Sequence, residues 1–156
     1  MKRTEPQWEI MLPQSMRSRW TDLLHFGVDA KGVANRSGGR LVYVATPYSR
    51  VVVDDHGKWC RMRDAEASVW ASKVCADLAR AGATGVSPIV LSTGMCGASR
   101  LDPLDEKFWN AWCAPLLAAC GSIYVPDLPG WQASRGIWTE CVWALGHNMP
   151  VLLEAR

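Results

Sequence analysis

Glu140 is the residue of this chain whose type and surroundings best suggest chemistry. It lies in an apolar stretch, residues 134–146, whose periodicity predicts a helix. Burying a carboxylate without a partner is costly or forces the group to take up a proton. Glu140 is therefore either a carboxylate at the rim of the helix, paired with an arginine, or a group that faces a ligand.

Two smaller residues before Glu140 suit a ligand site. Ser134 precedes it by six residues and Gly136 by four. Glycine costs roughly 1 kcal/mol inside a helix, so Gly136 needs a steric reason, either room for a ligand or close packing on a sheet. Ser134 is predicted to be the N-cap residue of the helix, where its hydroxyl and the free backbone N–H groups also suit an anion such as phosphate.

Polar residues end two of the predicted strands. The stretch TPYS follows the strand at 40–46 and supplies the hydroxyls of Thr46, Tyr48 and Ser49. The stretch lacks the glycines of a dinucleotide or P-loop fingerprint, which argues against both classes of nucleotide site. It also supplies few groups that could bind the phosphate of FMN, which argues against an FMN-binding, flavodoxin-like protein. Asp127 ends the strand at 121–128, where it either faces a ligand or forms the turn of PDLPG.

The elements that must position these residues alternate along the chain. Strands are predicted at 40–46, 85–92, 121–128 and 149–156. Helices are predicted between them, at about 61–81, from 102 onward and at 134–146. This order predicts an α/β fold, a flavodoxin- or Rossmann-like three-layer sandwich with a parallel sheet of four to five strands and helices on both faces. In such folds ligands bind beyond the carboxyl ends of the strands.

Local signals predict where these helices begin and end. Gly82 is expected as the residue that ends the helix at 61–81. Asp102 is expected as the N-cap residue of the next helix, and Pro115 is expected to kink or split it. The stretch TGMCGASR, residues 93–100, is predicted to be a flexible loop.

Composition limits the classes of function. With 156 residues, 49% of them hydrophobic and 21% charged, the chain is a globular protein. The net charge of +2 is too small to indicate nucleic acid as a partner. No apolar run reaches the roughly 18 residues needed to cross a membrane, and no secretory signal is present, so a cytoplasmic location is expected.

Cysteines and tryptophans suggest packing roles. The six cysteines form no CxxC pair and no zinc spacing, so we expect reduced thiols and no metal or cofactor. The three histidines form no triad, and no nucleophile elbow is present. The nine tryptophans suit a core and an interface, so a homo-oligomer is expected.

Residues 1–39 are assigned to an N-terminal arm, with a short helix within 13–26 and a loop at 28–39, and residues 40–156 to one α/β domain.

Several of these stretches together resemble a known superfamily. The segments LVYVATPYS, RMRDAEA, GVSPIV and above all PGWQASRGIWTE resemble small bacterial and phage domains that are similar to nucleoside 2-deoxyribosyltransferases, a superfamily that also contains nucleotide N-glycosidases. The similarity covers residues 40–153, and its most specific part is the Ser-x-Gly-x-x-x-Glu pattern. It implies N-glycosidic bond cleavage or (deoxy)ribosyl transfer on a nucleoside or nucleoside 5′-monophosphate.

The resemblance also implies roles for individual residues. Glu140 matches the nucleophile that attacks the anomeric carbon, and Tyr43 matches the tyrosine that orients it. Ser134 matches the position that contacts a 5′-phosphate or sugar hydroxyl, and Asp127 is placed like the carboxylate near the base. The substrate-binding residues implied are Thr46, Pro47, Tyr48, Ser49, Trp131, Ser134 and Gly136.

The chain departs from its relatives at two positions. Relatives carry a sugar-binding Asp in the helix before the third strand, whereas here Asp105 reads as a first-turn residue and Cys113 stands at the expected place. The first loop, ATPYS, is also not glycine-rich. These departures favour an alternative, a non-catalytic nucleotide-binding or sensor domain on the same fold. A catalytic Glu140 should lie in an open cleft within hydrogen-bond reach of Tyr43.

Overall fold

A parallel five-stranded sheet forms the centre of the molecule. The computed structural model describes residues 6–8 and 22–155. The strand order is β1-β5-β4-β2-β3, and all neighbouring strands pair in parallel. The strands are β1 (Leu24–His25), β2 (Val42–Val44), β3 (Gly85–Val86), β4 (Ser122–Val125) and β5 (Val151–Leu153).

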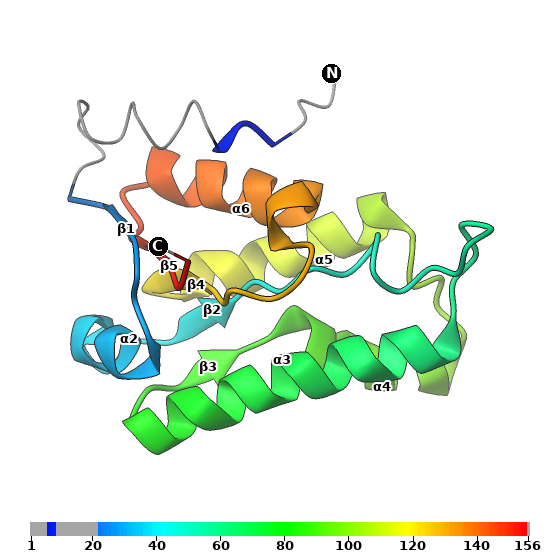
Figure 1. Cartoon of the computed structure of the whole chain (residues 1–156), viewed down its shortest axis with the longest axis horizontal. Coiled ribbons are helices and arrows are strands. Elements are labelled where there is room, and N and C mark those ends of the chain that lie inside the picture. Colours follow the sequence, from blue (N-terminus) through cyan, green and yellow to red (C-terminus); the bar gives the residue numbers. More distant parts are fainter. Residues whose placement is uncertain (1–5, 9–21, 156) are drawn as a thin grey trace.

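Helices cover both faces of the sheet, which confirms the predicted three-layer α/β architecture. Figure 1 shows α5 and α6 on one side of the strands and α2 and α3 on the other. The helices are α2 (Ala30–Ser37), α3 (Arg61–Ala81), α4 (Pro88–Ser99), α5 (Glu106–Ala119) and α6 (Arg135–Gly146), with the short 3-10 helix η1 (Trp131–Ala133) before α6. Within the described ranges, no helix has the length and apolar character needed to span a membrane.

The side chains of the central strands alternate between two cores. Tyr43 and Ile123 pack with residues of α5 and α6. Val42, Val44 and Tyr124 pack on the other face, against α2 and α3. Every residue of β2, β4 and β5 is buried, as expected for parallel strands covered on both faces.

Two helices begin and end where the sequence predicts. Helix α3 spans residues 61–81, and Gly82 ends it in the left-handed conformation, with φ of 92°. Its N–H donates to the carbonyl of Ala79 at 3.1 Å. The Ser134 hydroxyl caps α6 by accepting from the N–H of Ile137 at 3.4 Å. Both are local signals that need no tertiary context.

The predicted strand at 85–92 is correct only for its first two residues, and the predicted loop at 93–100 is wrong. The strand ends at Val86, and α4 occupies residues 88–99. The Ser87 hydroxyl accepts from the N–H of Val90 at 3.3 Å, and Pro88 stands at the first helical position. This cap and proline start a helix, and they outweigh the short apolar run that suggested a strand.

Helix α5 also differs from expectation. Its N-cap residue is Asp105, which accepts from the N–H of Phe108 at 3.1 Å. Asp102 instead binds the N–H of Leu104 at 2.9 Å, in the turn before the helix. The helix runs through Pro115 to Ala119 without being split. Proline lacks its own N–H and crowds the carbonyl four residues earlier, but the helix still continues for four residues beyond it.

Among the described residues before position 40, two elements are present. Leu24 and His25 form the edge strand β1, beside β5, and residues 22–26 contain no helix; residues 13–21 of the predicted helix lie outside the described residues. The predicted loop at 28–39 contains α2, which Asp29 caps by accepting from the N–H of Gly32 at 2.8 Å. The glycines and the asparagine of this stretch favoured a loop over a helix, although Asp29 is a typical N-cap residue.

Candidate active site

Tyr43 and Glu140 meet at one end of a cavity, although 97 residues separate them in the chain. The Tyr43 hydroxyl donates a hydrogen bond to Oε1 of Glu140 at 2.5 Å. Tyr43 is fully buried on β2, and burial, followed by the Glu140 carboxylate, raises the pKa of its phenol far above the ordinary value. The phenol therefore stays protonated and serves as a permanent donor to Glu140.

Glu140 lies on α6, half-buried, and lines the cavity. Burial raises the pKa of its carboxyl to about 7, and the hydrogen bond from Tyr43 opposes this rise. A carboxyl with such a pKa changes its charge in the neutral range, as acids and bases at active sites commonly do.

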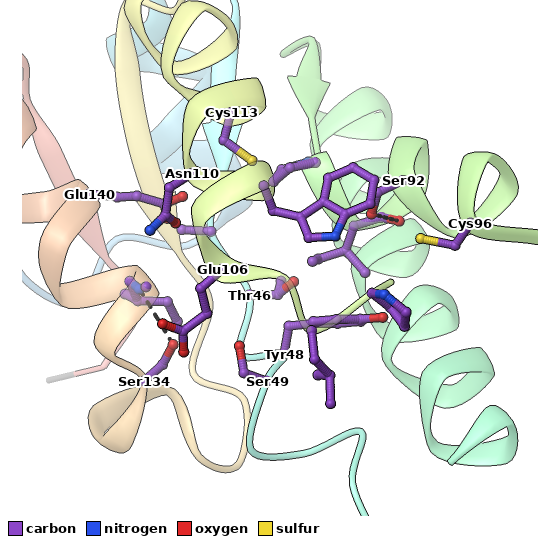
Figure 2. Close-up of a pocket in the computed structure, with 18 residues that line it drawn as sticks. Thr46, Tyr48, Ser49, Ser92, Cys96, Glu106, Asn110, Cys113, Ser134 and Glu140 are labelled. Atoms are coloured by element: carbon purple, nitrogen blue, oxygen red, sulfur yellow. Dashed lines mark hydrogen bonds between the residues drawn. The ribbon is translucent and has the colours of Figure 1, made fainter. Parts of the chain in front are cut away.

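The cavity beside Glu140, here called the inner cavity, has a volume of about 110 Å³. Its walls come from the end of β2 and from α4, α5 and α6 (Figure 2). Thr46, Ser92 and Cys113 contribute polar side chains, and Pro88 and Ile89 contribute apolar ones. The cavity thus lies beyond the carboxyl end of β2, where ligands bind in this class of fold.

A larger cavity of about 430 Å³, here called the outer cleft, continues from the inner one. Arg50, Arg135 and Trp138 line it, together with Pro47. Six residues line both spaces and form the junction between them: Tyr48, Ser49, Glu106, Asn110, Ser134 and Gly136. The volume of the outer cleft alone falls in the range of small-molecule sites.

Helix α5 contributes a face that sequence reasoning missed. Glu106, Trp109, Asn110 and Cys113 line the inner cavity from successive turns of this helix. Their spacing of three, four and seven residues places them on one face, and this was the signal available in the sequence. Figure 2 shows the Glu106 side chain pointing toward Ser134.

Cys113 stands where relatives were expected to carry an Asp. Burial first, and the Glu140 carboxylate second, raise the pKa of its thiol to about 11. The thiol is therefore neutral at physiological pH, so it cannot supply the negative charge of the expected carboxylate. Asp105 does not replace it, since that residue caps α5.

Gly136 lines both cavities without being pressed against other atoms. A Cβ atom built on it would meet only the Ser134 Oγ, at 3.8 Å, an ordinary contact distance. Close packing on the sheet is thus not the reason for a glycine at this position. Of the two explanations that the sequence left open, room beside the cavity is the one that the geometry favours.

A hydrogen bond between Tyr48 and the buried Asp64 holds the loop after β2 in place. The Tyr48 hydroxyl donates to Oδ1 of Asp64 at 2.6 Å, and Asp64 lies buried in the first turn of α3. Burial, followed by this hydrogen bond, raises the pKa of Tyr48 above its ordinary value. Asp64 therefore fixes the position of a residue that lines both cavities.

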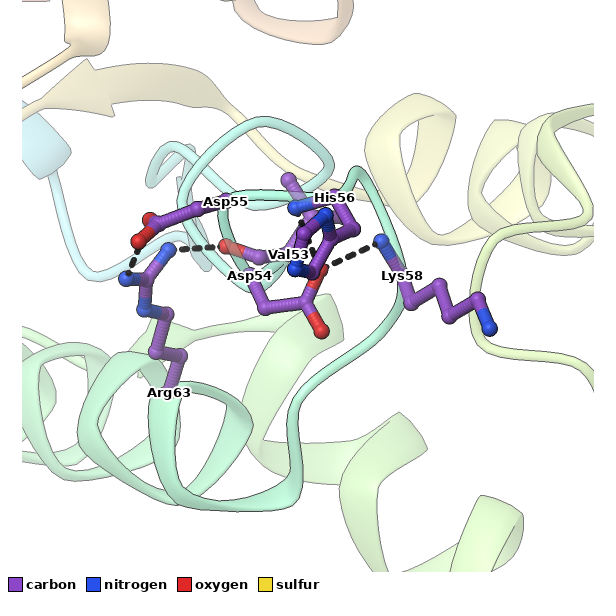
Figure 3. Close-up of polar contacts among 6 residues, drawn as sticks. All are labelled: Val53, Asp54, Asp55, His56, Lys58 and Arg63. Atoms are coloured by element: carbon purple, nitrogen blue, oxygen red, sulfur yellow. Dashed lines mark hydrogen bonds and ion pairs between the residues drawn. The ribbon is translucent and has the colours of Figure 1, made fainter.

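The segment at 51–60 contains a turn at DDHG, residues 54–57, and lies beside α3 (Figure 3). Oδ1 of Asp54 accepts from the N–H groups of His56 and Lys58, both at 2.9 Å. Arg63 binds Asp55 at 3.3 Å and also donates to the carbonyl of Val53. These bonds fasten the segment to α3 next to the loop that carries Tyr48.

The predicted site residues divide into two groups. Those that line the inner cavity or the outer cleft are Thr46, Pro47, Tyr48, Ser49, Ser134, Gly136 and Glu140. Tyr43, Asp127 and Trp131 line neither, although Tyr43 reaches the site through its hydrogen bond to Glu140. The Trp131 Nε1 donates to Oδ1 of Asp127 at 3.0 Å, and the Asp127 N–H donates to Glu154 at 2.8 Å. Trp131 is buried against Trp8, with ring centroids 5.0 Å apart.

The described residues bring together no group of three or more His, Cys, Asp or Glu side chains that could hold a metal ion. A family model described as a domain of unknown function, DUF1937, matches residues 40–155 of the chain. No curated protein matches the chain. The matched segment contains all the residues that line the two cavities.

Proposed function

Because the chain belongs to the DUF1937 family, whose description names no activity, we propose a function from the site itself. The protein cleaves the N-glycosidic bond of a nucleoside or nucleoside 5′-monophosphate, or transfers its (deoxy)ribosyl group, with Glu140 as the nucleophile. One observation carries the proposal: a glutamate that lines a cavity and is oriented by the buried phenol of Tyr43 at 2.5 Å. The resemblance to the deoxyribosyltransferase superfamily supports the same assignment.

The reaction needs one bond made and one broken in each of two steps. A Glu140 oxygen attacks the anomeric carbon, and the bonding electrons of the N-glycosidic bond leave with the base, which takes up a proton. Water, or the nitrogen of a second base, then attacks the anomeric carbon and gives up a proton, and the carboxylate of Glu140 leaves restored. Of the Glu140 oxygens, only Oε1 is hydrogen-bonded within the described part of the chain, which leaves Oε2 for the attack.

Tyr43 and Glu106 suit supporting roles. A hydrogen bond to a carboxylate favours its charged form, so Tyr43 helps to keep Glu140 ionised against the effect of burial. Glu106 is the other carboxylate among the residues that line the two described cavities. In this proposal it handles the proton that the departing base requires.

The outer cleft suits the 5′ side of the substrate. Arg50 and Arg135 supply positive charge there, and Ser134 stands at the N-terminus of the twelve-residue helix α6. Guanidinium groups and helix N-termini both favour phosphate. A nucleoside 5′-monophosphate should therefore react better than the nucleoside with the same base.

The test is release of free base from a panel of nucleosides and nucleoside 5′-monophosphates, followed by chromatography. Wild type and Glu66→Gln, a change at an exposed residue of α3, should release base. Glu140→Gln keeps the side-chain shape but removes the nucleophile, so it should release none. Equal release by Glu140→Gln and wild type would rule out Glu140 as the nucleophile.

A second candidate is a non-catalytic nucleotide-binding or sensor domain. It is favoured by the pKa of about 7 at Glu140, because a large share of that carboxyl is protonated at neutral pH, and by the neutral thiol of Cys113. Nucleotide binding by wild type without release of base, across the pH range of 6 to 9, would favour this function.

A further inference from the structure

The two cavities and their junction differ in chemical character. Part of the inner cavity is apolar, with Pro88 and Ile89 of α4 and Trp109 of α5 in its walls. The junction carries the polar side chains of Ser49, Glu106, Asn110 and Ser134, and the outer cleft carries two arginines. From the inner cavity through the junction to the outer cleft, these three environments match a heterocycle, a sugar and a phosphate. Flat rings favour apolar walls, sugar hydroxyls need hydrogen-bonding partners, and phosphate favours guanidinium groups.

The volume of the inner cavity limits the size of the ring that can enter it. Its volume is about 110 Å³. An engineered cavity of about 150 Å³ in another protein binds benzene, a single six-membered ring. The inner cavity is smaller than that and opens into the junction, so a single six-membered ring already extends toward the junction, and a fused second ring needs still more space.

Thr46 brings an unused hydrogen-bonding group to this cavity. The residue is 8% exposed, and its Oγ1 has no hydrogen-bond partner within the described residues. A buried hydroxyl without a partner is costly, and such groups in native structures commonly have a functional reason. The nearby Ser92 hydroxyl differs, since it already donates to the carbonyl of Ile89 at 3.3 Å.

We propose that the inner cavity is a slot for a single-ring heterocycle, so that the substrate is a pyrimidine nucleoside or nucleotide, and that the Thr46 hydroxyl is the hydrogen-bond partner that recognises the ring. The inference rests on the proposed function for its order of base, sugar and phosphate. A hydroxyl both donates and accepts, so Thr46 can pair with a ring carbonyl or with a ring nitrogen.

The first test is equilibrium binding of free bases to the wild-type protein by ligand-observed NMR titration. Uracil and cytosine should bind, and adenine and hypoxanthine should bind at least about tenfold more weakly, because a fused second ring needs still more space. Purines that bind as tightly as pyrimidines, or an absence of pyrimidine binding, would overturn the inference.

The second test compares two variants that each remove a buried hydroxyl. Thr46→Val keeps the shape of the side chain, and Ser122→Ala removes another hydroxyl that lacks a partner within the described residues, on β4 and outside both cavities. Neither change should destabilise the protein, since no hydrogen bond is lost. Only Thr46→Val should weaken pyrimidine binding, roughly three- to tenfold. Unchanged affinity in a folded Thr46→Val protein would remove Thr46 from ring recognition.

These outcomes separate the inference from the proposed function. Binding of a free base needs no attack by Glu140, so pyrimidine binding without any turnover refutes the glycosyl chemistry and leaves the slot intact. Release of purines from their nucleotides at the rate of pyrimidines refutes the slot and leaves the chemistry intact.

Discussion

Replacing Glu140 with glutamine should make the stability of the protein less dependent on pH. In wild type, burial raises the pKa of this carboxyl from 4.5 to about 7 in the folded state. The folded protein thus binds the proton more tightly than the unfolded chain. The stabilising effect of the bound proton is complete below pH 4.5 and is lost as the pH rises to about 7. Glutamine has no such proton to lose.

The size of the effect follows from the pKa change. Each pKa unit corresponds to about 1.4 kcal/mol, so the rise at Glu140 corresponds to up to about 3 kcal/mol at pH 8. The amide oxygen of glutamine can still accept the hydrogen bond that Tyr43 donates, so this contact is kept. The free energy of unfolding of Glu140→Gln minus that of wild type should therefore be larger at pH 8 than at pH 4.5, by up to about 3 kcal/mol.

The measurement is urea denaturation of both proteins at several pH values between 4.5 and 8. The quantity to compare is the difference in free energy of unfolding between variant and wild type, which should grow with pH. Glu66→Gln, at an exposed position of α3, is the matched control and should follow wild type throughout. A difference between Glu140→Gln and wild type that stays constant over this range would refute the claim that Glu140 is desolvated in the folded state.

Three further changes test the site. Tyr43→Phe removes the hydrogen bond that opposes the raised pKa of Glu140. Base release at pH 7 should therefore fall about tenfold or more, and the pH profile of base release should move to higher pH. An unchanged pH profile would contradict this role of Tyr43. Gly136→Ala should raise the free energy of unfolding by up to about 1 kcal/mol, since alanine favours helix, yet lower kcat/KM by taking space beside the cavity. Unchanged kcat/KM would mean that the substrate does not approach this position. Tyr48→Phe leaves Asp64 buried without the donor that it has at 2.6 Å, so urea denaturation should show a loss of about 1–3 kcal/mol; wild-type stability would show that water replaces the lost donor.

Local signals in the sequence were enough for much of the fold. Buried apolar strands predicted the parallel sheet, and Gly82 and Ser134 marked helix ends correctly, because these caps depend only on neighbouring residues. The error at α4 came from judging residues 88–92 by their apolar character and overlooking the Ser87 cap. The apolar run alone does not separate a strand from a buried helix.

Only some residues of the candidate site could be predicted from the sequence. Thr46, Tyr48 and Ser49 were expected because they follow a strand, and they do line the cavities. Asp127 also follows a strand, but its carboxylate binds Trp131 away from both cavities. Position after a strand therefore predicts proximity to the site, and packing decides where each side chain points.

The sequence by itself determined the spacing of Ser134, Gly136 and Glu140, because the geometry of an α-helix places such residues on one side within a few turns. It could not determine the environment of Glu140. The hydrogen bond from Tyr43 joins residues 97 positions apart, and the raised pKa of Glu140 arises from burial by several elements. Only tertiary packing brings these elements together, so only the tertiary structure decided which face of α5 turns toward the cavity and how large the inner cavity is.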